Sequence, residues 1–142
     1  NLREYLYRGG FWFVDDFHGD LEFDVFANTV QKILPESYFV ELNTTHPIFH
    51  VFYDIPKIEQ VVNDSLILCR PSCEQWENGE SGKVPKVFAV FLPGTSDIAI
   101  LASHNNDLGD GLEHADNPFY PHEQVTFAAK MSLNVIIYAL TH

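Results

Sequence analysis

The chain has 142 residues with 20 acidic and 8 basic side chains, which gives a formal net charge of −12 at pH 7. This charge excludes binding to the phosphate backbone of nucleic acids, which needs clustered lysine and arginine side chains. No stretch approaches the roughly 20 apolar residues of a membrane-spanning helix, so we expect no membrane span. The length of the chain predicts a single domain, residues 1–142.

The N-terminal segment predicts a short helix, a break at two glycines and then a strand. Apolar residues at helical spacing precede Gly9 and Gly10, and glycine ends a helix easily because it adopts a left-handed backbone without steric cost. The apolar run Phe11–Val14 does not alternate with polar residues, which indicates a strand buried on both faces in the middle of a parallel sheet. Asp15 and Asp16 then lie at the carboxyl end of that strand, the edge at which open α/β sheets bind ligands.

A helix and a strand follow. The segment Phe23–Leu34 has its apolar residues on one helical face, with Asp20 or Asp24 as the candidate N-cap. Pro35 ends this helix, because the residue before a proline disfavours the helical conformation. The β-rich segment Tyr38–Leu42 predicts the second strand.

The middle of the chain contains shorter and more polar segments. We expect a turn or the start of a short helix at Pro47, a helical turn over Pro56–Val62 and a short strand over Leu66–Leu68. Residues 70–84 are rich in glycine, serine, asparagine and glutamate, which predicts a surface loop inserted in the domain.

The two cysteines lie at the start of this loop with the spacing C-x3-C. A structural zinc site requires a second pair of ligands with its own short spacing, and the chain has no further cysteine. Cys69 and Cys73 therefore form either a local disulfide or two free thiols, and neither alternative fixes the compartment.

Two strands and a long helix complete the chain. Lys86–Leu92 and Asp97–Ser103 are separated by a short segment with proline and glycine, which is typical of a β-hairpin. A polar loop over residues 103–111 follows, and His122–Leu140 is apolar on most of its circumference, which predicts a helix packed on the sheet. Together these elements predict an α/β fold with a mostly parallel sheet, one hairpin and helices on both faces.

The first candidate site is the acidic segment after the first strand. Asp16 and His18 are two residues apart and face the same side of an extended chain, whereas Asp15 faces the other side. Two carboxylates and one imidazole suit either a divalent cation or acid–base chemistry. The structural alternative is that the carboxylates accept backbone N–H groups at the end of the strand.

The second candidate is the pair His46 and His50. Their spacing places both imidazoles on one face of a helix, as in zinc sites. No glutamate follows His46, which excludes the HExxH metalloprotease motif. The alternative is one histidine in a turn and one histidine beside the core.

The third candidate is the polar loop after the second hairpin strand, which is rich in side-chain oxygen atoms. If its strand belongs to the same sheet as Phe11–Val14, the loop meets the acidic segment at one rim; alternatively, its Asn and Asp residues form ordinary turns. We therefore predict a ligand site formed by Asp15, Asp16, His18, Asn106 and Asp107. The predicted ligands of a divalent cation are Asp16, His18, His46, His50 and His104.

Three stretches carry a resemblance to a known family: LREYL to VDD at residues 2–16, HPIFHVFY at 46–53, and NDLGD at 106–110 with NVIIYALTH at 134–142. In this order they resemble a bacterial family of uncharacterised domains, carried on envelope-associated or exported proteins, whose fold is similar to that of class I glutamine amidotransferases. The resemblance implies a flavodoxin-like three-layer α/β sandwich that lacks its N-terminal β/α units. It also implies a bacterial protein with a periplasmic or envelope location.

The resemblance bears on function as well. Class I amidotransferases have a nucleophilic cysteine on a strand-to-helix elbow, and neither Cys69 nor Cys73 lies in such a segment, so glutaminase activity is not implied. We therefore expect a non-catalytic module of a larger envelope protein that binds a ligand or a partner. The alternatives are a metal-dependent hydrolase built on the Asp/His cluster, and an oligomerisation module whose open sheet edge pairs with a second copy or an upstream segment.

Overall fold

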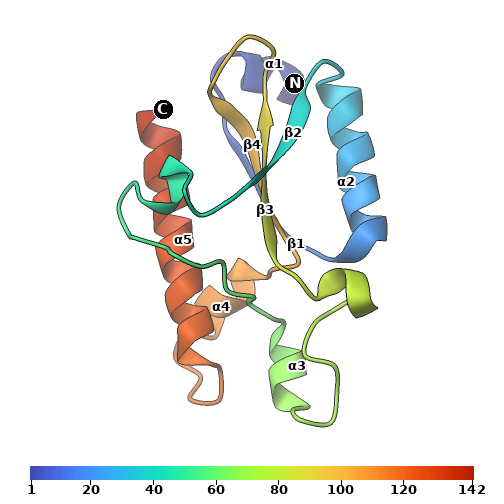
Figure 1. The fold of residues 1–142 in the computed structure, drawn as a ribbon, viewed down its shortest axis with the longest axis vertical. Helices are drawn as coiled ribbons and strands as arrows, with labels where there is room; N and C mark the ends of the chain where they lie inside the picture. Colours follow the sequence, from blue (N-terminus) through green and yellow to red (C-terminus); the bar gives the residue numbers. More distant parts are fainter.

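The computed structural model describes residues 1–142 and contains one four-stranded mixed sheet with the strand order β1-β4-β3-β2 (Figure 1). β1 (Trp12–Phe17) is parallel to β4 (Ile98–His104). β3 (Lys86–Phe91) is antiparallel to β4 on one side and to β2 (Tyr38–Leu42) on the other. β4 and β3 are therefore the inner strands, and β1 and β2 are the two edges.

Helices cover both faces of the sheet. α2 (Gly19–Ile33) lies on one face and α5 (His122–Thr141) on the other (Figure 1). The remaining helices are short: α1 (Leu2–Tyr7), α3 (Asp64–Leu68), α4 (Leu108–Glu113) and the 3-10 helices η1 (Pro47–Phe49) and η2 (Gly79–Gly82). None of the helices has both the length and the apolar character needed to cross a membrane.

Two hydrophobic clusters form the core, one on each face of the sheet. Phe26 of α2 belongs to a cluster of 9 buried residues, and Phe127 of α5 belongs to a cluster of 18. The alternation of side chains along β4 sends Ala102 into the first cluster and Leu101 into the second. Every residue of β4 is buried, because this strand has a neighbour on each side and helices on both faces.

The sheet differs from the predicted one in two respects: it is mixed rather than mostly parallel, and β1 lies at its edge rather than in its middle. The prediction for Phe11–Val14 is wrong on this point, because an apolar run indicates covered faces but not paired edges. Most residues of β1 are only half-buried. α2 then carries the chain from β1 to β2, at the opposite edge of the sheet.

Several predicted elements are confirmed. The strand Tyr38–Leu42 occurs as β2 with the predicted bounds, the predicted hairpin is β3 with β4, and the C-terminal helix is α5. The predicted helix at Phe23 begins earlier, at Gly19, and neither predicted aspartate caps it. Instead, the carboxylate of Glu22 accepts the backbone N–H of His18 at 2.6 Å.

Two short elements differ from the prediction. Leu66–Leu68 belongs to the helix α3 rather than to a strand, because the side chain of Asn63 accepts the N–H of Ser65 and starts a helix. Pro56–Val62 forms no helical turn. The N–H of Val61 there donates to a side chain from the loop after β4, a partner that no local pattern reveals.

Candidate functional site

The carboxyl ends of β1 and β4 form one rim, because the two strands are parallel neighbours. At this rim the backbone N–H of Asp16 donates to the carbonyl of Asn106 (3.1 Å), and that of Asn105 donates to the carbonyl of Phe17 (3.0 Å). Asp16 and Asn105 both have left-handed backbones, with φ of 59° and 58°, a conformation that is uncommon outside glycine. The two segments therefore turn together and fix the direction of the side chains around them.

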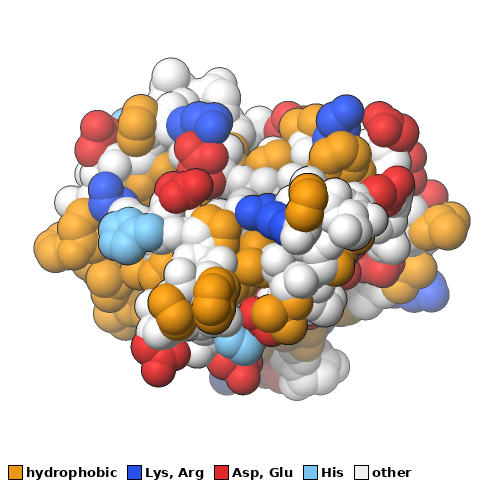
Figure 2. Space-filling view, turned by 90° about the horizontal axis from the view of Figure 1, so that it is seen from below, with side chains coloured by type: hydrophobic (Ala, Val, Ile, Leu, Met, Phe, Trp, Pro, Cys, Tyr) orange, Lys and Arg blue, Asp and Glu red, His pale blue; other side chains and the backbone are white.

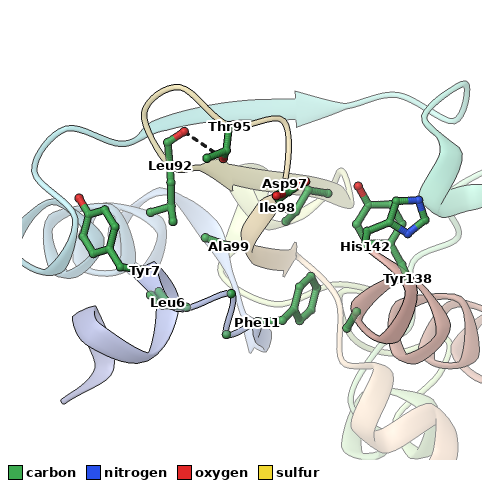
Figure 3. Close-up of a pocket in the computed structure, with 13 residues that line it drawn as sticks. Leu6, Tyr7, Phe11, Leu92, Thr95, Asp97, Ile98, Ala99, Tyr138 and His142 are labelled. Atoms are coloured by element: carbon green, nitrogen blue, oxygen red, sulfur yellow. Dashed lines mark hydrogen bonds between the residues drawn. The ribbon is translucent and has the colours of Figure 1, made fainter.

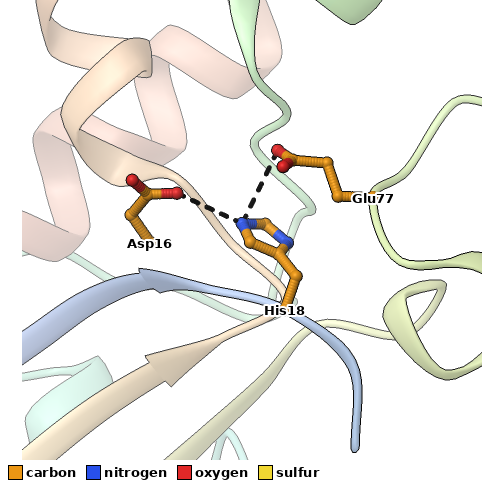
Figure 4. A group of neighbouring side chains, drawn as sticks. All are labelled: Asp16, His18 and Glu77. Carbon is orange, nitrogen blue, oxygen red and sulfur yellow. Dashed lines mark ion pairs between the residues drawn. The ribbon is translucent and has the colours of Figure 1, made fainter. Parts of the chain in front are cut away.

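Asp16, His18 and Glu77 come together at this rim (Figure 4). The Nε2 atom of His18 lies 3.4 Å from Oδ1 of Asp16 and 3.7 Å from Oε1 of Glu77. One ligand atom from each side chain lies within 4.8 Å of the other two. The two carboxylates thus approach the same ring nitrogen, and we call this group the rim cluster.

The imidazole of His18 is buried without a hydrogen bond. Its side chain is 5% exposed, and neither Nδ1 nor Nε2 has a hydrogen-bond partner. Oε1 of Glu77 is also buried and unpartnered, whereas the side chain of Asp16 is 64% exposed and forms the open side of the cluster. Buried polar atoms in proteins normally have partners, so these atoms are free to bind a ligand.

The loop over residues 70–84 carries Glu77 to the rim. The Nδ2 atom of Asn78 donates to the carbonyl of His18 at 2.7 Å, and that of Asn105 donates to two carbonyls of the loop at 2.9 and 2.8 Å. The loop is therefore anchored at the rim by amide side chains. At its start, Cys69 and Cys73 form a disulfide, which is the first of the two alternatives left open by the sequence.

Asp15 faces the other side of β1. Its Oδ2 accepts the backbone N–H of Gly109 at 3.0 Å, and its Oδ1 is buried with no hydrogen-bond partner. Burial raises the pKa of the Asp15 carboxyl to about 6, and the nearby charge of Asp107 adds to this shift. The adjacent acids Asp15 and Asp16 therefore lie in two different environments.

Asn106 and Asp107 lie at the rim, but their oxygen atoms hold the backbone of the chain. Oδ1 of Asn106 accepts the N–H of Val61 at 2.6 Å, while its Nδ2 is buried and unpartnered. Oδ1 of Asp107 accepts the N–H of Asp110 at 2.8 Å and caps α4. Burial raises the pKa of Asp107, and the negative charges of Asp16 and Asp110 raise this pKa further.

His104 lies close to the rim but faces the core. Its ring packs against those of Phe17 and Phe23, with centroids 5.0 and 5.1 Å away, and its Nε2 lies 3.1 Å from the carbonyl oxygen of Gly19. Burial lowers the pKa of His104. The structure thus gives this predicted metal ligand a packing role outside the rim cluster.

His46 and His50 flank η1, away from the rim. Nδ1 of His46 accepts the N–H of Ile48 at 3.3 Å, and its ring lies 6.1 Å from that of Tyr138 near the C-terminus of α5. Nδ1 of His50 instead lies 2.6 Å from Oδ1 of Asp54. The two imidazoles therefore have separate partners, and neither approaches the rim cluster.

A second group of potential metal ligands lies on α4 and consists of Asp110, Glu113 and His114. Oδ2 of Asp110 accepts the N–H of Asp64 at 2.8 Å, and the ring of His114 stacks on that of Tyr120 at 5.9 Å. None of the three residues is fully buried. These contacts explain the group without a ligand, so we assign no site to it.

A hollow of about 140 Å³ lies at the other end of β1, between α1, the β3–β4 turn and the C-terminus of α5 (Figure 3). Its lining includes Leu6, Phe11 and the stacked rings of Tyr138 and His142, whose centroids are 4.2 Å apart. None of the predicted site residues lines this hollow. The candidate site is therefore the rim and not this end of the sheet.

Glu77 is the residue that sequence reasoning missed. It is one of three glutamates in a polar loop, together with Glu74 and Glu80, and nothing in their spacing distinguishes it. Only the anchoring of the loop beside His18 selects Glu77.

A comparison with models of protein families matches residues 1–140 to a domain of unknown function, DUF4159. The chain belongs to this family. The matched segment includes every residue of the rim cluster, and the predicted membership of an uncharacterised domain family is confirmed at this level. No curated protein and no solved structure matches the chain. The chemistry of this DUF4159 domain therefore has to be inferred from the site itself.

Proposed function

We propose that this DUF4159 domain is a ligand-binding module whose site contains a divalent cation held by Asp16, His18 and Glu77. The observation that carries the proposal is the imidazole of His18, which is buried, has no hydrogen-bond partner on either nitrogen and points between two carboxylates. Carboxylates and neutral imidazole are the ligands that Zn²⁺ and Mn²⁺ accept in proteins.

The spacing of the donor atoms supports a single ion. Ligand atoms about 2.1 Å from a tetrahedral Zn²⁺ lie roughly 3.4 Å from one another. The distances from Nε2 of His18 to the two carboxylate oxygens are 3.4 and 3.7 Å, close to this value. A cation would also offset the negative charge of the carboxylates that gather at the rim.

Three protein ligands leave coordination positions open towards solvent. Asp16 is the exposed member of the cluster, so an incoming ligand reaches the cation from its side. A small molecule with a carboxylate or phosphate oxygen would complete the coordination, because these anions are oxygen donors with a charge opposite to that of the ion. The proposed module therefore recognises an oxyanion through the cation.

The test is a metal titration of the purified protein after treatment with EDTA. We expect calorimetry to show one Zn²⁺ or Mn²⁺ per chain, and the melting temperature to rise when the ion is present. Glu77→Gln should lower the affinity for the ion by at least about tenfold. Glu80→Gln is the matched control, because Glu80 is an exposed glutamate of the same loop. The proposal fails if the unmodified protein binds no ion or if both variants bind it equally.

A metal-dependent hydrolase is the second candidate, favoured by the number of protein ligands. Catalytic zinc sites have three protein ligands and one position for a water molecule, whose pKa the cation lowers. Phosphatase and esterase substrates offered to the metal-loaded protein test this candidate. Turnover that EDTA abolishes and that Glu77→Gln reduces would establish it, and no turnover by the metal-loaded protein would exclude it.

We further propose that the domain is a non-catalytic part of a larger bacterial envelope protein, with the flavodoxin-like, amidotransferase-like fold that the resemblance implies. The disulfide between Cys69 and Cys73 supports this in two ways: it leaves no free cysteine as a glutaminase nucleophile, and it suits an oxidising compartment. Each edge strand of the sheet is paired on one side only, so an upstream β/α unit or a second copy has a strand to pair with.

Two measurements check this wider proposal. Glutaminase turnover by the oxidised protein would contradict a non-catalytic role. Light scattering that reports a monomer at high protein concentration would exclude the homo-oligomer and leave an upstream segment as the partner of the open edge.

A further inference from the structure

A groove of about 400 Å³ runs beside the free edge of β1, between this strand, α4 and α5. Its volume is within the range of small-molecule pockets. Its lining includes Phe13 and Asp15 of β1, Phe11 just before this strand, and one face each of α4 and α5, with Leu112 and Ile136 among them. Three regular elements therefore build a continuous apolar wall.

Part of the lining of the groove is exposed to solvent. Seen from the end of the molecule that carries α3 and α4, apolar side chains are exposed among acidic and basic ones (Figure 2). Leu112 and Ile136 of the groove are 46% and 54% exposed. The groove is therefore accessible to a ligand from solvent.

Asp15 is the only charged residue among those that line the groove. Its Oδ2 accepts the N–H of Gly109, but its Oδ1 is buried and has no partner. No lysine, arginine or histidine lines the groove to pair with this oxygen. A carboxylate in an apolar wall with an unpartnered oxygen is costly unless a donor satisfies it.

We propose that this groove binds a small apolar molecule with one protonated amine, whose ammonium group pairs with the carboxylate of Asp15. A neutral apolar ligand would leave Oδ1 of this carboxylate buried and unpartnered, and an anionic ligand would be repelled by the carboxylate. An ammonium group supplies both the donor and the opposite charge, in a charge-assisted hydrogen bond. The groove walls supply the apolar contacts for the rest of the molecule.

A second copy of the chain fits the groove less well. A symmetric dimer through this face would bring two copies of Asp15 into one apolar interface, and burying two like charges without partners is strongly unfavourable. The net charge of −12 on each copy adds to the repulsion. A small cation meets neither obstacle.

The groove is independent of the rim cluster, because Asp15 and Asp16 face different sides of β1. The test is therefore made on the metal-free protein. We titrate it with 4-phenylbutylamine, 4-phenylbutanol and 4-phenylbutyrate, which share one apolar body, and follow the amide signals by NMR. The amine should bind at least about tenfold more tightly than the alcohol, and the acid most weakly. Equal binding of amine and alcohol, or shifts centred away from Leu112 and Ile136, would overturn the proposal.

Variants make the test specific. Asp15→Asn should reduce the affinity for the amine to that of the alcohol, whereas Asp24→Asn, at an exposed acid of α2, should leave it unchanged. Ile136→Arg fills the groove from a half-exposed position and should abolish binding of both probes in a folded protein, which keeps the test valid if Asp15→Asn unfolds. Glu77→Gln should bind the amine normally, so failure of the cation site and failure of the groove are distinguishable. Unchanged amine affinity in folded Asp15→Asn, or a dimer that Ile136→Arg dissociates, would contradict the proposal.

Discussion

The left-handed backbone at Asp16 separates two acids that are adjacent in the sequence. The pairing of β1 with β4 is regular up to Val14 and shifts before Phe17, and φ of Asp16 is 59°. The carboxylate of Asp15 consequently points at α4, while that of Asp16 points at His18. One pair of neighbouring residues therefore contributes to two distinct sites, one proposed for a cation and one for an amine.

Asp15 should lower the stability of the protein at neutral pH. Its folded-state pKa is about 6, against an ordinary value of 3.8, so between these values the folded protein holds the proton more tightly than the unfolded chain. The free energy of unfolding then falls as the pH rises through this window. Asp15→Asn removes this loss and should be more stable than the unmodified protein by up to roughly 3 kcal/mol above about pH 6, with no such gain below about pH 4. Urea denaturation in EDTA at several pH values measures the difference, and a difference independent of pH would contradict the prediction.

Asn105 should be among the most costly residues to truncate at the rim. It is 1% exposed, its Oδ1 accepts the N–H of Gly19 at 2.8 Å, and its Nδ2 donates to the carbonyls of Ser81 and Val84. Asn105→Ala leaves these groups without partners, so the free energy of unfolding should fall by about 2–4 kcal/mol in urea denaturation. Asn28→Ala, at an exposed position of α2, is the control and should change it by less than about 0.5 kcal/mol. Similar losses of unfolding free energy in both variants would show that the hydrogen bonds of the Asn105 amide do not stabilise the fold.

At the scale of elements, the contact between α4 and α5 positions the loop that follows β4. Gly111 lies at this contact: a Cβ atom added there would lie 2.7 Å from Cβ of Ala128 and 2.9 Å from Cγ1 of Val61. α4 approaches α5 this closely only because the position has no side chain. The approach also holds the N-terminus of α4, with Gly109, against Asp15.

Gly111→Ala should therefore push α4 away from α5. We expect the free energy of unfolding to fall by about 1–3 kcal/mol, the usual cost of overpacking. Gly109→Ala in the same helix is the matched control. A Cβ atom added at Gly109 would have only Oδ1 of Asp107 nearby, at 3.3 Å, and alanine has a higher helix propensity than glycine. Urea denaturation of both variants measures the difference; a loss in Gly109→Ala as large as that in Gly111→Ala would exclude the helix contact as the cause.

At the scale of the whole molecule, the excess of acidic side chains should make stability depend on salt. With 20 acidic and 8 basic residues, repulsion between surface carboxylates disfavours the compact state, and dissolved ions screen it. The melting temperature in EDTA should rise by a few degrees from about 10 mM to about 500 mM NaCl. Choline chloride should act like NaCl, because screening does not depend on the identity of the cation. An unchanged or lower melting temperature at high salt would contradict the prediction.

Elements with local signals can be predicted from the amino-acid sequence. β2, the β3–β4 hairpin and α5 follow from β-branched and aromatic runs, from turn residues and from helical periodicity, all of which act within a few residues. Local patterns also predict Asp15 and Asp16 near the end of β1 and a polar loop after β4, but the two meet at one rim only because these strands are neighbours. Such patterns determine where an element forms and which of its faces is apolar.

The order of the strands and the contacts between distant side chains depend on how the whole chain packs. The apolar run of β1 did not reveal that this strand lies at an edge, and the short run Leu66–Leu68 did not reveal a helix. Glu77 reaches His18 because Asn78 anchors its loop to a residue 60 positions away in the sequence. Contacts of this kind depend on how distant segments pack against each other, and local conformational preference carries no information about them.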